Sequence, residues 1–164
     1  ADAARFTGLS EKLMDRSPFE LSGGQKRRVA IAGIIAMDPE ILVLDEPAAG
    51  LDPAGKKEIL DRLKAYQRER EKTLILISHS MEDMASYADE IVVMKDGSVF
   101  CHDTVDGIFS DPARVEEAGL ELPQITRLMM RLSARGVPVD PGVHTVDAAV
   151  ACVSSLLRGG DKTC

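Results

Sequence analysis

Two short and almost continuously apolar runs, EILVLD at residues 40–45 and TLILIS at residues 73–78, constrain the fold more than any other feature. A run of this kind fits a strand that is buried on both faces, as in a parallel sheet. Between the runs, Asp52 and Pro53 supply an N-cap and a first-turn proline for a helix expected to reach about Glu71. Strand, helix and strand in this order predict a layered α/β fold.

The flanking segments are expected to be mainly helical. Ser22 is a good N-cap for a helix over residues 25–37, and Ser80 can cap a short helix that runs through Tyr87. The dipeptide Asp96-Gly97 predicts an antiparallel hairpin. Beyond about residue 104, helical stretches are expected after two prolines and at residues 146–158. The prolines that open them are Pro112 and Pro123.

Composition excludes several classes of protein. The formal charge of −7 argues against a protein whose main work is binding nucleic acid. No apolar run in the 164 residues reaches transmembrane length, so contact with a membrane is expected to be peripheral. Cys101, Cys152 and Cys164 show no metal-ligand spacing, which favours reduced thiols in a cytosolic protein.

Three stretches carry residues suited to chemistry. The first apolar run ends in Asp45 and Glu46, where a parallel sheet binds ligands, although the two acids can also cap a following helix. His79 follows the second run, so it is expected at the same edge, as a phosphate donor or as a turn residue. LSGGQ at residues 21–25 opens a helix with two glycines, which suits an anion or a simple capped turn.

The chain contains, in this order, LSGGQ, a strand that ends in Asp-Glu, AAGLDP and a strand that ends in histidine. This order of motifs resembles that of the ATP-binding-cassette (ABC) ATPases. Residues 21–25 look like the signature loop of that family, residues 41–46 like its Walker B strand, residues 48–52 like its D-loop and His79 like its switch histidine. The resemblance covers residues 17–103, and Ala48 departs from the serine or threonine more usual there.

In that family two cassettes face each other, and the signature loop of one covers the nucleotide held by the other. The resemblance therefore implies that this chain contacts the γ-phosphate of an ATP bound to a partner subunit. The residues implied in this contact are Ser22, Gly23, Gly24 and Gln25.

The resemblance also implies a role for each polar residue at the strand ends. Asp45 would hold Mg²⁺ through water, and Glu46 would orient or deprotonate the attacking water. His79 would bind the γ-phosphate, and Asp52 would cross the dimer interface and couple the two sites. ATP and Mg²⁺ are the cofactors implied.

A phosphate-cradling Gly-x-x-x-x-Gly-Lys-Ser/Thr motif is missing from the sequence. GLDPAGKK at residues 50–57 is the nearest match, but it ends in Lys57 instead of a hydroxyl residue and contains Pro53. The expected fold is therefore the second half of a P-loop NTPase (ABC cassette) layered α/β sheet with a helical C-terminal extension, and the chain is expected to be truncated before Ala1. The expected parts are the end of a helical subdomain (1–20), the C-terminal half of a nucleotide-binding domain (21–103) and the extension (104–164).

Residues 17–47 and 78–97, with EEAGLELPQITRLMMRLSARG further on, resemble the ATPase subunits of energy-coupling-factor importers for vitamins or metal ions such as cobalt. The expected partners are a second ATPase subunit, a transmembrane coupling subunit and a substrate-binding membrane subunit. The expected location is the cytoplasmic face of the membrane, and no nucleic acid partner is expected. The alternatives are a soluble non-transport ABC ATPase and a trans-acting cap or dimerisation module without its own nucleotide site.

Two further segments allow two interpretations each. The apolar stripe of the helix after Pro123 either packs on its own domain or pairs with another subunit; it comprises Ile125, Leu128, Met129 and Leu132. The basic run at residues 26–28 is expected to be a solvated face, with salt-bridge partners as the alternative.

Overall fold

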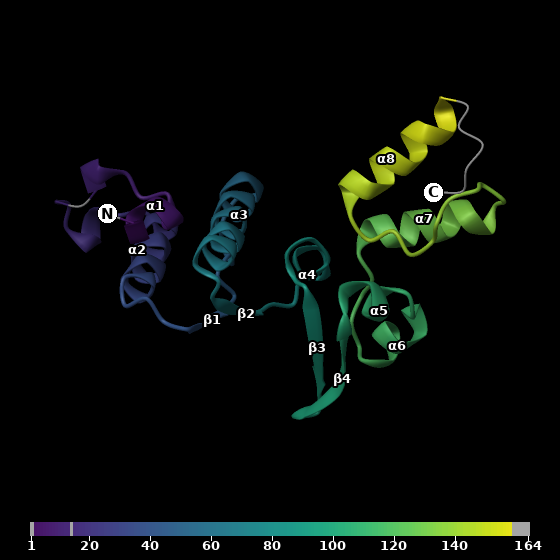
Figure 1. Ribbon diagram of the computed structural model, residues 1–164, viewed down its shortest axis with the longest axis horizontal. Helices are drawn as coiled ribbons and strands as arrows, with labels where there is room; N and C mark the ends of the chain where they lie inside the picture. Colours follow the sequence, from purple (N-terminus) through teal and green to yellow (C-terminus); the bar gives the residue numbers. More distant parts are fainter. Residues whose placement is uncertain (1, 14, 159–164) are drawn as a thin grey trace. The chain divides into compact units, whose positions relative to one another are not determined.

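The computed structural model describes residues 2–13 and 15–158, and the chain forms two compact units, Ala1–His79 and Ser80–Cys164 (Figure 1). The elements of the first unit alternate between helices and two strands. They are α1 (Asp2–Thr7), the 3-10 turns η1 (Glu11–Leu13) and η2 (Pro18–Glu20), α2 (Gly23–Ile35), β1 (Ile41–Asp45), α3 (Pro53–Arg70) and β2 (Thr73–Ile77).

The two strands of the first unit pair in parallel, from Ile41 opposite Thr73 to Asp45 opposite Ile77. The predicted strand–helix–strand order and α/β fold class are therefore confirmed. Parallel pairing follows from the connection, because α3 carries the chain back to the starting end of the sheet before β2 begins.

Burial of the strands on both faces was a wrong prediction. Leu42 and Leu44 of β1 are buried, but the alternate residue Val43 is 54% exposed and Ile75 of β2 is 46% exposed. Figure 1 shows α2 and α3 on the same side of these strands. Because the helices of this unit cover only one face of a two-stranded sheet, the other face stays open.

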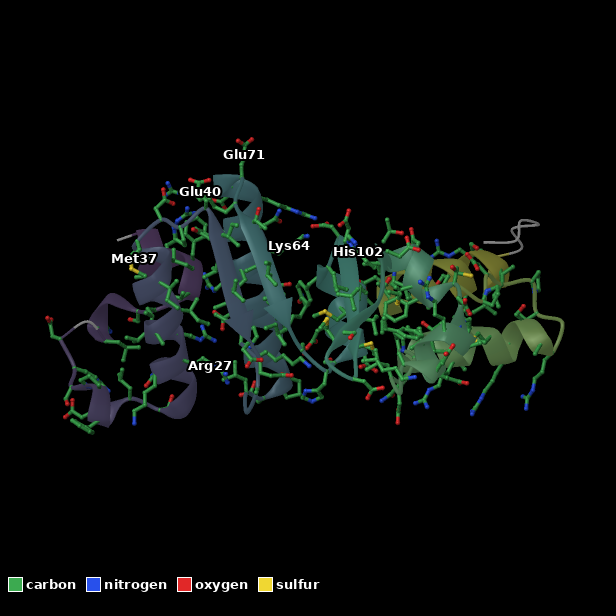
Figure 2. All side chains as sticks on the ribbon, turned by 90° about the horizontal axis from the view of Figure 1, so that it is seen from below. Arg27, Met37, Glu40, Lys64, Glu71 and His102 are labelled. Atoms are coloured by element: carbon green, nitrogen blue, oxygen red, sulfur yellow. The ribbon has the colours of Figure 1, made fainter. Side chains whose placement is uncertain are left out.

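The core of the first unit lies along α3, where four buried residues are at most 3% exposed; they are Ile59, Leu60, Leu63 and Tyr66. Phe6 of α1 packs edge-on against Tyr66, with ring centroids 5.2 Å apart. Asp52 caps α3 by accepting a hydrogen bond from the Gly55 N–H at 2.7 Å. The helix ends at Glu71, whose left-handed backbone (φ 53°) turns the chain and leaves the side chain projecting outward (Figure 2).

The second unit begins with α4 (Met81–Tyr87), followed by the hairpin of β3 (Glu90–Lys95) and β4 (Ser98–Thr104). The hairpin was predicted from Asp96-Gly97, and both residues have the positive φ angles, 50° and 76°, that a tight hairpin turn requires. Helix α5 (Val105–Phe109) follows directly and was not predicted, although Thr104 caps it by accepting from the Gly107 N–H.

Three more helices complete the second unit: α6 (Pro112–Glu117), α7 (Gln124–Ala134) and α8 (Val146–Leu157). Met129 of α7 and Cys152 of α8 belong to one buried cluster, against which Ile125 and Leu132 also pack. Leu128 is 49% exposed. Most of the α7 stripe therefore packs within its own unit.

Two of the three cysteines lie in the described part of the chain. Cys101 is a buried free thiol, as expected, and the Cys152 side chain is buried as well. Cys164 lies outside the described residues.

Candidate functional site

The carboxyl ends of β1 and β2 lie at one edge of the sheet. The Glu46 N–H continues the ladder beyond Asp45 by donating to the Ile77 carbonyl at 2.9 Å. The chain leaves β2 two residues before His79. Polar residues that directly follow parallel strands are thereby brought to the same place, which is where open α/β sheets bind ligands.

Glu46 and His79 are in direct contact at this edge. Glu46 Oε1 accepts a hydrogen bond from the His79 backbone N–H at 3.0 Å, and it lies 2.6 Å from His79 Nδ1. An ionised carboxylate can only accept, so this contact requires the ring proton on Nδ1. The opposite ring nitrogen, Nε2, is then available as an acceptor, or as a donor when the ring is protonated, on a side chain that is 88% exposed.

The backbone and the charge of Glu46 are both unusual. Its φ of 46° lies in the left-handed region, which costs a residue other than glycine about 1 kcal/mol or more. Burial raises the pKa of Glu46, but the side-chain and backbone hydrogen bonds from His79, with the charge of Lys56, outweigh burial and hold the pKa below 4.5. Glu46 is therefore an ionised acceptor near neutral pH, held in a strained position.

Asp45 is the last residue of β1, and its side chain is exposed. In the described part of the chain, no group of three or more His, Cys, Asp or Glu residues could hold a metal ion by itself. A single carboxylate suits Mg²⁺ that takes most of its ligands from water and phosphate.

The LSGGQ stretch forms the start of α2. Ser22 accepts from the Gln25 N–H at 3.3 Å, and the Gln25 side chain accepts from the Ser22 N–H at 2.9 Å, which completes a capping box. Among the described residues, the N–H groups of Gly23 and Gly24 have no hydrogen-bond partner. A Cβ on Gly23 would meet open space. Two unpaired donors at the positive end of a 13-residue helix can bind an anion.

Residues 48–52 connect the strand end to α3 and contact the start of α2. Arg27 Nη1 donates to the Ala49 carbonyl at 2.8 Å. A Cβ on Gly24 would lie 2.9 Å from Leu51 Cδ2, so the two stretches pack closely and the Leu51 side chain would have to move to admit a larger residue. The structure thus brings Glu46 to His79, and residues 21–25 to residues 48–52.

The GLDPAGKK segment does not form a phosphate loop in the structure. Helix α3 already begins at Pro53, and Lys57 pairs with Asp61 one turn later at 2.7 Å. Sequence reasoning missed two residues near the signature helix, Gly8 and Glu58. Glu58 pairs with Arg28 at 2.7 Å, so the basic run is not wholly a solvated face. A glycine directly after α1 was the only available signal for Gly8.

Parallel strands with acids at their carboxyl edge, behind a glycine-opened helix, fit an ABC cassette-like fold, and the family model described as ABC transporter matches residues 1–49. Curated ABC transporter ATP-binding proteins are similar to nearly the whole chain. Within the described residues, no helix has both the length and the apolar character to span a membrane.

Among curated proteins, the chain is similar to energy-coupling factor transporter ATP-binding protein EcfA2. It is 51% identical to the protein of Caldanaerobacter subterraneus subsp. tengcongensis over 158 residues, covering 96% of this chain and 55% of the relative. Identity to the Bacillus subtilis protein is 48% over 160 residues, or 97% of this chain and 58% of the relative. The chain therefore spans about half the length of the curated relatives that it matches.

Solved structures agree with this assignment. The chain is 41% identical to cbiO1 from Clostridium perfringens, described as part of the ABC transporter complex cbiONQ, with a TM-score of 0.62 over 78% of this chain and 51% of that chain. The ATP-binding cassette MJ0796, in a dimeric post-hydrolysis state with ADP and Pi, is 31% identical, with a TM-score of 0.58 over 63% of this chain and 44% of that chain.

Proposed function

We propose that this chain is the C-terminal half of the ATP-hydrolysing subunit of an energy-coupling-factor-type importer. The observation that carries the proposal is the pairing of Glu46 with His79 at the carboxyl edge of the sheet, with Glu46 in a left-handed backbone conformation. Similarity to EcfA2 over nearly the whole chain supports the importer class. The names of these relatives state no solute, so vitamin or metal-ion uptake, including cobalt, stays a prediction.

The proposed chemistry is water attack on the γ-phosphate of ATP, which breaks the bond from the γ-phosphorus to the bridging oxygen and releases ADP and phosphate. Glu46, ionised and fixed by His79, orients the attacking water and accepts its proton. The exposed ring of His79 donates to a phosphate oxygen when its second nitrogen is protonated. Mg²⁺, when bound, would neutralise charge on the phosphates, and Asp45 would hold it through water.

The start of α2 acts on a second nucleotide, which is held by the partner ATPase. The unpaired N–H groups of Gly23 and Gly24 fit phosphate oxygens, and the Ser22 and Gln25 side chains support the helix start. Asp52, at the start of α3, lies in the loop proposed to cross the dimer interface. The dimeric state of MJ0796 supports this arrangement. The partner complex is proposed to hold both ATPases at the cytoplasmic face of the membrane.

Glu46→Gln in the full-length ATPase tests the catalytic assignment. We expect the rate of ATP hydrolysis to fall by about 10²–10⁴ while ATP still binds, because glutamine keeps the shape but cannot accept the proton. Glu90→Gln is a matched control, since Glu90 also pairs with a histidine, His102, at 2.9 Å. Unchanged turnover of Glu46→Gln would remove Glu46 from the catalytic role.

Ser22→Arg tests the contact with the partner's nucleotide. The larger charged side chain is expected to block closure over that nucleotide and abolish turnover. Thr104→Arg is the control, because it removes an N-cap of the same kind from α5. Normal turnover with Ser22→Arg would contradict the contact across subunits.

The trans-acting alternative follows from the missing phosphate cradle. A titration of the 164-residue polypeptide with ATP is expected to show no binding. Micromolar binding to this polypeptide would mean that it has a nucleotide site of its own, and it would contradict the assignment as half of a site.

A further inference from the structure

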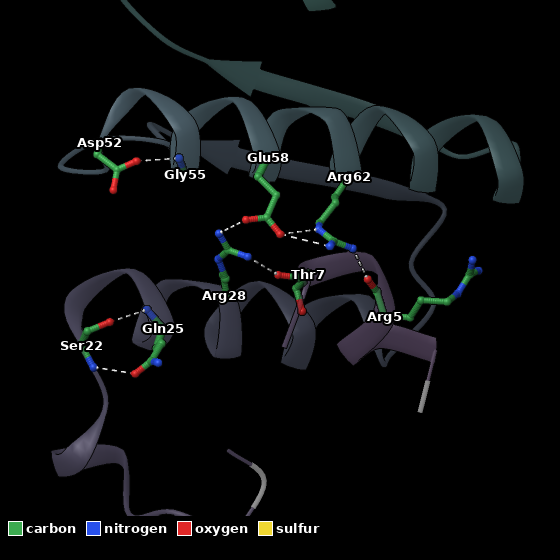
Figure 3. A network of polar contacts seen from close by, with 9 residues as sticks. All are labelled: Arg5, Thr7, Ser22, Gln25, Arg28, Asp52, Gly55, Glu58 and Arg62. Carbon is green, nitrogen blue, oxygen red and sulfur yellow. Dashed lines mark hydrogen bonds and ion pairs between the residues drawn. The ribbon is translucent and has the colours of Figure 1, made fainter. Parts of the chain in front are cut away.

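Two arginines from different helices converge on one carboxylate in the first unit (Figure 3). Arg28, in the second turn of α2, lies with Nη2 2.7 Å from Glu58 Oε2 of α3. Arg62, one turn further along α3, donates from Nε to Glu58 Oε1 at 3.0 Å. The hydrogen bond from Arg28 has the largest effect on the pKa of Glu58 and lowers it. Burial opposes this shift, the hydrogen bond from Arg62 adds to it, and the resulting pKa is about 2. Glu58 is therefore ionised and links both helices near neutral pH.

The same arginines also bind α1. Arg28 Nη1 donates to the Thr7 carbonyl at 3.4 Å, and Arg62 Nη1 donates to the Arg5 carbonyl at 2.8 Å. Gly8 ends α1 with a φ of 67°, and a Cβ there would lie 2.7 Å from Arg28 Nη1 and 2.7 Å from Arg62 Nε. A glycine at this position therefore leaves the space in which the guanidinium groups reach Glu58. We call Gly8, Arg28, Glu58 and Arg62 the junction.

The junction lies about one helical turn behind the signature stretch, residues 21–25. Arg28 follows Gly24 by four residues, which is about 6 Å along α2. At the helix start, Gly24 packs on Leu51, and Arg27 binds the Ala49 carbonyl at 2.8 Å. Helix α2 thus contacts residues 48–52 at the signature stretch and Glu58 of α3 about one turn later, so a rotation or slide of α2 would break one of these contacts.

We propose that the junction positions the signature stretch against residues 48–52, and that Arg28 and Glu58 are positioning residues for hydrolysis of the partner's nucleotide. This inference rests on the proposed function, because the signature stretch meets a nucleotide held by another subunit only when the chain works in a pair of ATPases. Displacement of a reacting group by about 1 Å can reduce a rate by about 10²-fold. Loss of one of two joints should allow a smaller shift, and we expect a reduction of about 10-fold.

The junction differs from the ordinary surface ion pairs of this unit. Lys57 and Asp61 pair within α3 at 2.7 Å, with side chains that are 72% and 49% exposed. The Arg28 side chain is only 16% exposed and bridges three helices. Exposed pairs within one helix contribute little, so Asp61→Asn is a matched control for Glu58→Gln on the same helix.

The test uses the full-length ATPase in a dimer with a wild-type partner, purified through two affinity tags. A chain with Glu46→Gln cannot hydrolyse its own ATP, so the remaining turnover reports the partner's nucleotide, covered by this chain's signature stretch. Adding Glu58→Gln to that chain is expected to reduce the remaining kcat by about 10-fold. The affinity of the variant chain for its own ATP should change less than 2-fold, and adding Asp61→Asn should change neither quantity.

A second variant, Arg28→Lys, keeps the charge but loses the fork that spans Glu58 and the Thr7 carbonyl, so it should give an intermediate rate. Arg28→Met with Glu58→Gln should reduce kcat no more than either change alone, because both break the same joint. Unchanged kcat with Glu58→Gln, or equal losses in kcat and in the chain's own ATP affinity, would overturn the positioning role. If Glu46→Gln alone leaves the dimer at its full rate, the failure lies in the proposed function instead.

Discussion

Replacement of Gly8 by alanine is expected to destabilise the first unit by two separate effects. Gly8 has a φ of 67°, and placing alanine in the left-handed region costs about 1–2 kcal/mol. The new Cβ would also approach Arg28 Nη1 and Arg62 Nε to 2.7 Å, and Glu58 Oε1 to 2.9 Å. These atoms are the ends of flexible side chains, so they can move away, and the cost is the loss of their mutual hydrogen bonds.

The size of that loss follows from exposure. Charge-assisted hydrogen bonds contribute about 1.5–3 kcal/mol when buried, but the Glu58 side chain is 43% exposed, so screening reduces the loss to about 1 kcal/mol. The total for Gly8→Ala is therefore about 2–3 kcal/mol. At a typical urea dependence of about 2 kcal/mol per molar, the unfolding midpoint should fall by roughly 1 M.

The assay is urea unfolding of the full-length protein, followed by circular dichroism. Gly50→Ala is the matched control, because Gly50 has a φ of 74° in the same unit and open space around its missing Cβ. It should show the backbone cost alone. In a Glu58→Gln background, Gly8→Ala should destabilise the protein no more than Gly50→Ala does, because the hydrogen bonds to the Glu58 carboxylate are already lost. Equal destabilisation by the two glycine substitutions in the wild-type background would refute the steric reasoning.

Three further outcomes follow from single groups. Glu58 has a pKa of about 2 against an ordinary 4.5, chiefly because of Arg28, so it stabilises the folded state above pH 4.5, and this contribution is lost as the pH falls toward 2. The Glu58 side chain is 43% exposed, so its contribution to the free energy of unfolding is discounted to about 1 kcal/mol. In Glu58→Gln the free energy of unfolding, measured with urea from pH 6 to pH 3, should fall by about that much less than in the wild type. Tyr66→Phe should leave thermal stability unchanged or raise it by up to about 1 kcal/mol, because the buried Tyr66 hydroxyl has no hydrogen-bond partner; a clear loss would reveal one. Ser22→Ala should cost about 1 kcal/mol in the same unfolding assay and Ser22→Gly less, since Ser22 caps α2; equal stability of Ser22→Ala and wild type would contradict the cap.

Much of the fold could be predicted because its signals are local. The N-caps Ser22, Asp52 and Ser80 and the turn at Asp96-Gly97 act within a few residues, and each begins or ends the expected element. The order of motifs also placed Glu46 and His79 at one edge, because successive parallel strands end on the same side of a sheet. Helix α5 was missed because its five residues follow β4 without a break.

Long-range pairing could not be predicted in the same way. Arg28 and Glu58 are 30 residues apart, and no local pattern distinguishes Glu58 from the exposed acid Asp61 one turn later. The open face of the sheet, with Val43 half exposed, was also missed, because an apolar strand has the same sequence whether one or both faces are covered.

By itself the sequence determined the strand–helix–strand order, the helix starts and the residue types at the sheet edge, since these depend on neighbouring residues and a fixed repeat. Only the tertiary structure decided that Glu46 accepts from His79, and that Gly8 leaves room for two arginines around Glu58. The physical reason is that such contacts depend on where separate helices and strands pack, and packing is set by the whole core rather than by any one segment.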